Sequence, residues 1–110
     1  MNSLKNLINY IESDEELEYA IRMSHDWNEE SFIKMVQLLE NVKNDYTNSD
    51  CLPKTYVMYC VSTIPRILGM LHHFKNSTDE KRNLFIEEKA ERLRQISQDF
   101  IGVGYEHEKF

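Results

Sequence analysis

The chain of 110 residues contains only three glycines and two prolines. A β-rich domain of this size would need more turn residues, so their scarcity favours long helices joined by short connections. With so few glycines, no glycine-rich loop is available to cradle a phosphate. The length fits a single domain, residues 1–110, that folds without disulfides or a metal.

Cysteines and long apolar runs are scarce as well. Cys51 and Cys60 lie on or beside one predicted helix, whose rise separates them by about 13 Å, too far for a disulfide. A reduced, cytoplasmic setting is therefore expected. The N-terminus has no sustained apolar run of the kind found in signal peptides. The most apolar segment, residues 56–71, is interrupted by polar residues and a proline and does not predict a membrane span.

Basic side chains are in the minority, with 13 Lys and Arg against 19 Asp and Glu and a formal net charge of −6. Nonspecific nucleic-acid binding draws its affinity from Lys and Arg at phosphates, so this balance argues against a nucleic-acid partner. A basic protein partner fits the charge, because opposite charges accelerate encounter. We therefore expect no direct contact with nucleic acid or with a membrane.

The hydrophobic spacing is typical of helices. Apolar residues recur three and four positions apart in successive segments, which predicts an all-α fold, an antiparallel bundle of four to five helices. The first helix is expected over residues 3–11, and the last is expected to end near Ile101. Gly102 is placed to terminate that last helix, and residues 103–110, which have no clear periodicity, are expected to be frayed.

Capping patterns agree with the hydrophobic spacing. Three capping boxes, each a short polar residue followed by Glu three positions later, predict helix starts. The boxes pair Ser13 with Glu16, Asp26 with Glu29, and Ser77 with Glu80. Pro53 suits the first position of a further helix, and Pro65 inside the same helix is expected to kink or split it.

One motif on that helix points to catalysis. Arg66 is followed six and seven residues later by His72 and His73, and Arg66 and His73 are expected to share a face two turns apart. An arginine followed at this distance by histidine in a small all-α domain resembles the motif of the HEPN ribonucleases. The resemblance implies RNA cleavage at a dimer interface, with the histidine as acid or base.

Metal ligation has candidate residues but no motif. The candidates are His72, His73, His107, Cys51 and Cys60. No CxxC, HxxxH or ExxH spacing occurs, and adjacent histidines on a helix point about 100° apart, which disfavours joint ligation of one ion. We expect neither a metal nor a cofactor.

An acidic segment with one tryptophan is the remaining signal. It consists of Asp14, Glu15, Glu16 and Glu18, followed by Asp26, Trp27, Glu29 and Glu30. Aromatic anchors with an acidic rim suit a basic partner, although the same acids could serve only as first-turn residues of helices.

Three functions follow from these patterns. The favoured one is a non-catalytic binding protein that neutralises a basic partner, a cognate toxin, in the manner of bacterial immunity proteins and antitoxins. The first alternative is the HEPN-like ribonuclease. The second is a structural or regulatory module that self-associates, as a homodimer for example, through the outward apolar residues Ile33, Leu38 and Leu84.

Overall fold

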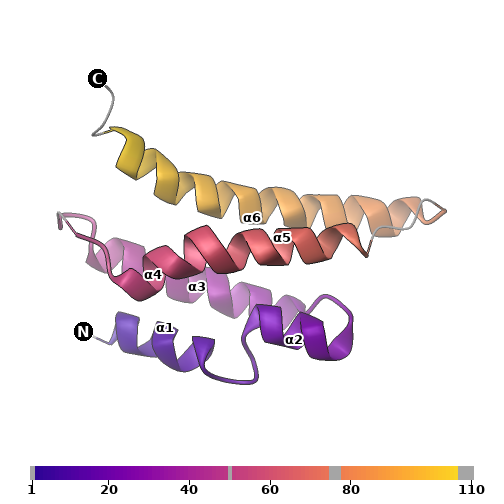
Figure 1. Ribbon diagram of the computed structural model, residues 1–110, viewed down its shortest axis with the longest axis horizontal. Helices are drawn as coiled ribbons and strands as arrows, with labels where there is room; N and C mark the ends of the chain where they lie inside the picture. The colour runs from indigo at the N-terminus through magenta and orange to yellow at the C-terminus, as the bar shows by residue number, and fades with distance from the viewer. Residues whose placement is uncertain (1, 50, 75–77, 107–110) are drawn as a thin grey trace. The chain divides into compact units, whose positions relative to one another are not determined.

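The computed structural model describes residues 2–49, 51–74 and 78–106, with side chains described through residue 97. This part of the chain forms α-helices and one π-helical turn and contains no strand (Figure 1). The predicted all-α fold is therefore confirmed. The chain divides into two compact units, Met1–Met58 and Tyr59–Phe110. No described helix is both long enough and apolar enough to cross a membrane.

Unit 1 contains α1 (Ser3–Ile11), α2 (Leu17–Ser24), α3 (Glu29–Asp45) and α4 (Lys54–Met58). The predicted bounds of the first helix are confirmed. Both α1 and α2 contact α3, and α1 runs antiparallel to it (Figure 1). The large buried side chains of this unit are those of Leu7, Tyr10, Leu17, Ile21, Phe32, Met35, Leu39, Val42 and Tyr56.

The prediction that Ser13 caps the second helix is wrong. Glu16 is the N-cap residue of α2, and its carboxylate accepts hydrogen bonds from the backbone N–H groups of Glu18 and Tyr19, both at 2.9 Å. Ser13 instead donates its hydroxyl hydrogen to the carbonyl oxygen of Tyr10 at 2.8 Å, which closes the turn after α1. The residues just before Glu16 therefore lie in a connecting turn rather than in the first turn of a helix.

The predicted cap of the third helix is also misplaced. The side-chain oxygen of Asn28 accepts the backbone N–H of Ser31 at 3.0 Å, whereas Asp26 accepts the neighbouring N–H of Trp27 at 2.8 Å. Short polar and acidic residues satisfy the capping-box spacing at several registers. Tertiary contacts made by Ser31 favour the later start.

The predicted interruption at Pro65 is confirmed. A π-helical turn, η1 (Tyr59–Thr63), leads into α5 (Ile64–His72), and Pro65 lies in the first turn of α5. In a regular α-helix the proline ring would clash with the carbonyl of Val61, and the wider π turn accommodates the ring. Pro53 lies one residue before α4, and its carbonyl oxygen accepts the N–H of Val57 at 3.1 Å.

The π turn changes which residues face inward. The α-helical spacing predicts Val61 on the buried face, but its side chain is 44% exposed, while Ile67 is fully buried. This turn is also bonded to α6. Pro65, five residues after Cys60, has no N–H to donate in a π register. The hydroxyl of Ser97 on α6 donates to the Cys60 carbonyl oxygen at 3.3 Å.

Helix α6 (Glu80–Glu106) runs antiparallel to α5 and contacts it within unit 2 (Figure 1). Asp79 caps it by accepting the N–H of Arg82 at 3.0 Å, while the predicted cap, Ser77, lies outside the described residues. The predicted end near Ile101 and Gly102 is wrong. A glycine inside a helix costs only about 1 kcal/mol relative to alanine, and α6 continues through it. Of the predicted tail, residues 107–110 lie outside the described part.

Candidate functional site

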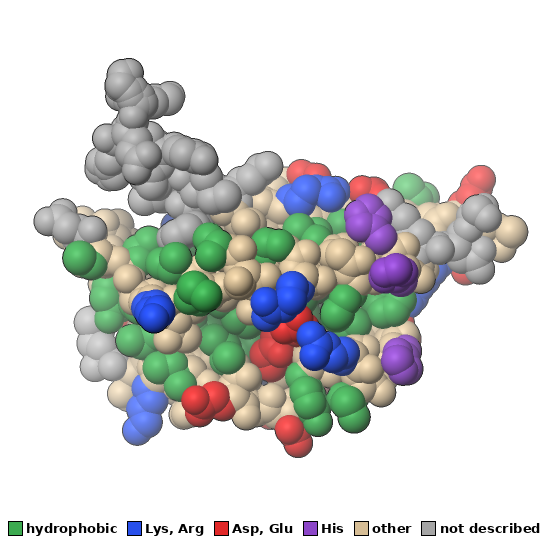
Figure 2. Space-filling model, viewed as in Figure 1, with side chains coloured by type: hydrophobic (Ala, Val, Ile, Leu, Met, Phe, Trp, Pro, Cys, Tyr) green, Lys and Arg blue, Asp and Glu red, His purple; other side chains and the backbone are tan. Residues whose placement is uncertain are grey.

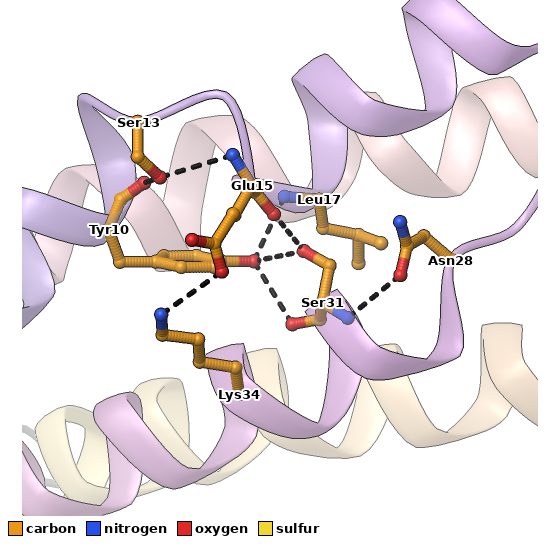
Figure 3. A network of polar contacts seen from close by, with 7 residues as sticks. All are labelled: Tyr10, Ser13, Glu15, Leu17, Asn28, Ser31 and Lys34. Atoms are coloured by element: carbon orange, nitrogen blue, oxygen red, sulfur yellow. Dashed lines mark hydrogen bonds and ion pairs between the residues drawn. The ribbon is translucent and has the colours of Figure 1, made fainter.

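A buried hydroxyl joins the three principal helices of unit 1 (Figure 3). The side chain of Tyr10 on α1 is 2% exposed. Its hydroxyl accepts the N–H of Leu17, the first residue of α2, at 2.9 Å. The same hydroxyl lies 2.7 Å from the Oγ of Ser31 on α3 and donates to the Ser31 carbonyl oxygen at 3.1 Å. The starts of α2 and α3 are thereby fixed to the end of α1.

The turn between α1 and α2 is tied directly to α3. The hydroxyl of Ser31 donates to the carbonyl oxygen of Glu15. The Nζ of Lys34, one turn further along α3, lies 3.2 Å from the carboxylate of Glu15 (Figure 3). These contacts hold the acidic turn against the first two turns of α3. The two acidic segments of the sequence thus lie side by side.

Six of the eight predicted site residues are exposed or half-buried. The carboxylates exposed to solvent are those of Asp14, Glu15, Asp26, Glu29 and Glu30. With Trp27 they form what we call the acidic surface. The other two serve the fold, because Glu16 is 6% exposed and caps α2, and the 12% exposed side chain of Glu18 pairs with Arg22 at 3.2 Å.

Trp27 is half-buried within the acidic surface. Its ring centroid lies 5.1 Å from that of Phe32, with the ring planes tilted by 50°. Its indole N–H donates to the carboxylate of Glu29 at 2.7 Å. The two contacts fix the ring and hold a carboxylate beside its edge, a combination that suits an arginine or lysine side chain through charge and cation–π attraction.

The net charge is confined to one unit. Unit 1 contains eleven Asp and Glu against five Lys and Arg, a net charge of −6, whereas unit 2 contains eight of each. The composition of the two halves differs in this way in the sequence itself, but the boundary between them, after Met58, comes from the structure.

The residues of the HEPN-like motif lie on α5. The guanidinium of Arg66 is exposed and donates to the Thr63 hydroxyl at 3.2 Å. His72 and His73 end the helix, and their side chains are exposed; Figure 2 shows histidines at the surface. Two helical turns place the backbones of Arg66 and His73 about 10 Å apart. No hydrogen bond joins them in the described chain, and the ribonuclease alternative remains a prediction.

No other chemical centre is evident in the described residues. They contain no group of three or more His, Cys, Asp or Glu that could hold a metal ion, and His107 lies outside them. Cys51 is exposed and Cys60 is buried. A cavity of about 20 Å³ between α5 and α6, lined partly by His72, Glu87 and Arg94, has room for about one water molecule. It is too small for an organic substrate.

Comparison of the chain with protein-family models, with curated proteins and with solved structures finds no match.

Proposed function

We propose that this chain is a binding protein that neutralises a basic protein partner through the acidic surface of unit 1, in the manner of a bacterial immunity protein or antitoxin. The observation that carries the proposal is the hydrogen-bond network of Tyr10, Ser31 and Glu15. This network brings two acidic segments of the chain together at one place.

Pre-organisation makes such a surface effective. The backbone beneath the exposed carboxylates is fixed by buried hydrogen bonds, so little conformational entropy is lost when a partner binds. The net charge of −6 on unit 1 attracts a cationic surface from a distance and raises the association rate. In such a complex, the carboxylates would occupy the positions where a nucleic-acid-binding toxin otherwise holds phosphates.

Trp27 supplies the anchor in this proposal. It combines a large apolar surface with fixed orientation, the properties of residues that dominate the energy of protein interfaces. Charge therefore governs how quickly the partner arrives, and Trp27 governs how long it stays.

The test first screens the proteins encoded beside this chain for one with a net positive charge, and then measures its association and dissociation rates with the chain over a salt series. We expect the double variant Asp14→Lys/Glu30→Lys to slow association by about tenfold at low salt with little change in dissociation. Trp27→Ala should raise the dissociation rate by about thirtyfold, equivalent to about 2 kcal/mol. Trp27→Phe separates the two contacts of the ring, because it keeps an aromatic ring beside Phe32 but loses the bond to Glu29.

A control of equal charge change lies in unit 2. Glu80→Lys/Glu91→Lys alters the net charge as much as the first variant does but leaves the acidic surface intact, and both residues are exposed. The proposal requires a much smaller effect from this control. Equal slowing by both double variants would mean that total charge matters and the acidic surface does not.

A further inference from the structure

The outer face of α3 carries an exposed isoleucine among acidic and polar side chains. Ile33 is 55% exposed. Glu29 and Glu30 lie four and three residues before it, and Gln37 and Glu40 lie four and seven residues after it. In an α-helix these spacings place all five on one face, and all five are exposed. We call them the α3 stripe.

Helix α6 carries the same pattern with the opposite charge. Phe85 is 37% exposed. Lys81 and Arg82 lie four and three residues before it, and Lys89 and Arg92 lie four and seven residues after it. The Cζ of Arg82 and the Nζ of Lys89 lie 5.9 Å and 5.3 Å from the centre of the Phe85 ring. We call these five residues the α6 stripe.

The acidic residues of α6 are fewer on this side of the helix than the bases. Glu87 and Glu91 both pair with Arg94, at 3.1 Å and 3.4 Å, away from Phe85 on the helix circumference. Glu88, three residues after Phe85, adjoins the stripe and reduces its charge. The four bases of the α6 stripe outnumber the one acid that adjoins it, Glu88, so this side of α6 has a positive charge within a unit of zero net charge.

We propose that the α3 stripe of one copy of this chain binds the α6 stripe of a second copy. On each helix, charged residues lie four and three positions before the central apolar residue, Ile33 or Phe85, and seven positions after it. Two helices that pack side by side would bury Ile33 against Phe85 and place the acids of one stripe opposite the bases of the other along the same face. The contact joins two different surfaces, so each copy retains one unused stripe.

The inference does not depend on the basic partner proposed above. It assigns a role to Ile33, which lies outside the acidic surface, and to the cations of α6. Glu29 and Glu30 belong both to the α3 stripe and to the acidic surface, so a second copy and a basic partner would compete for them. Each copy has a net charge of −6, and the resulting long-range repulsion makes the self-association weak.

The experiment measures the average mass of the full chain by sedimentation at increasing protein concentration. The α3 variant is Ile33→Lys/Glu40→Lys, which leaves every residue of the acidic surface in place. The α6 variant is Lys81→Glu/Arg92→Glu. Its matched control, Lys5→Glu/Lys54→Glu, changes two exposed lysines of unit 1 that lie on neither stripe. Wild type and control should self-associate, and each stripe variant should weaken the association by at least about tenfold.

The decisive sample is an equimolar mixture of the two stripe variants. The α3 variant retains a working α6 stripe, and the α6 variant retains a working α3 stripe, so the mixture should form a one-to-one dimer and nothing larger. Formation of this dimer in the mixture also shows that both variants are folded. A monomeric wild type at all concentrations, or a mixture that stays monomeric, would overturn the proposal. So would binding of a labelled single-stranded oligonucleotide that requires Lys81 and Arg92 while the chain remains monomeric.

Discussion

Replacing Tyr10 with phenylalanine removes one buried hydroxyl and leaves the ring in place. The N–H of Leu17 then loses its acceptor at 2.9 Å, and Leu17 itself is fully buried, so water cannot replace the lost oxygen. The Ser31 hydroxyl loses its contact at 2.7 Å but keeps the carbonyl oxygen of Glu15. One buried donor left without a partner costs about 1–3 kcal/mol, and we expect Tyr10→Phe to lower the free energy of unfolding by about 2 kcal/mol.

Urea denaturation followed by circular dichroism measures this loss. The midpoint should fall while the slope of the transition stays constant, because the same surface is exposed on unfolding. For 110 residues the unfolding entropy is about 0.23 kcal/mol/K, so the melting temperature should fall by about 9 °C. Tyr19→Phe is the matched control, since the Tyr19 side chain is 44% exposed, and it should change stability by less than about 0.5 kcal/mol.

Equal stability of the two phenylalanine variants would refute the reasoning. It would mean that the hydroxyl of Tyr10 adds nothing to the positioning of α2 and α3. The network could then not be what holds the two acidic segments together, and the proposed function would lose the observation that carries it.

Three further predictions concern the core, a cap and the ribonuclease alternative. Leu39→Ala and Leu93→Ala shorten side chains that are 3% and 0% exposed. Urea denaturation should show that each variant lowers the free energy of unfolding by about 2–5 kcal/mol. Near-neutral effects would mean that these side chains do not lie on the buried faces of their helices. In the same assay Asn28→Ala should cost about 1 kcal/mol and Asp26→Ala clearly less, and the reverse order would restore the predicted cap. Purified protein should not cleave single-stranded RNA; cleavage that disappears in His73→Ala would contradict this.

Periodicity predicted the helices well where it was the only signal. The first helix has apolar residues on one face and no competing cap, and its bounds were found from that pattern alone. Helix starts after Ser13 and Asp26 were placed too early, because several polar residues in each segment fit a capping box. The start of α3 at Asn28 accompanies the contact of Ser31 with Tyr10, twenty-one residues away, which local patterns do not contain.

The sequence predicts which kinds of residue form the candidate site, but it does not predict how their side chains are arranged. The sequence identified the acidic residues around Trp27, yet it treated Glu16 and Glu18 as equal to their neighbours. The hydrogen bonds that occupy Glu16, and the low exposure of Glu18, follow from the turn between α1 and α2. The α6 stripe is not evident in the linear sequence, because its bases between Lys81 and Arg92 are interspersed with acids and separate from them only around the circumference of the helix.

¹⁹F NMR at position 27 tests the central claim most directly, because Trp27 is the sole tryptophan of the chain. Labelling the chain with 5-fluorotryptophan distinguishes it from tryptophans of the partner, and a titration with the basic neighbour-encoded protein follows its ¹⁹F resonance. If the acidic surface is the binding site, the resonance should shift and saturate at the stoichiometry of the complex. Formation of a stable complex, established independently by sedimentation, with no change at Trp27 would contradict the account.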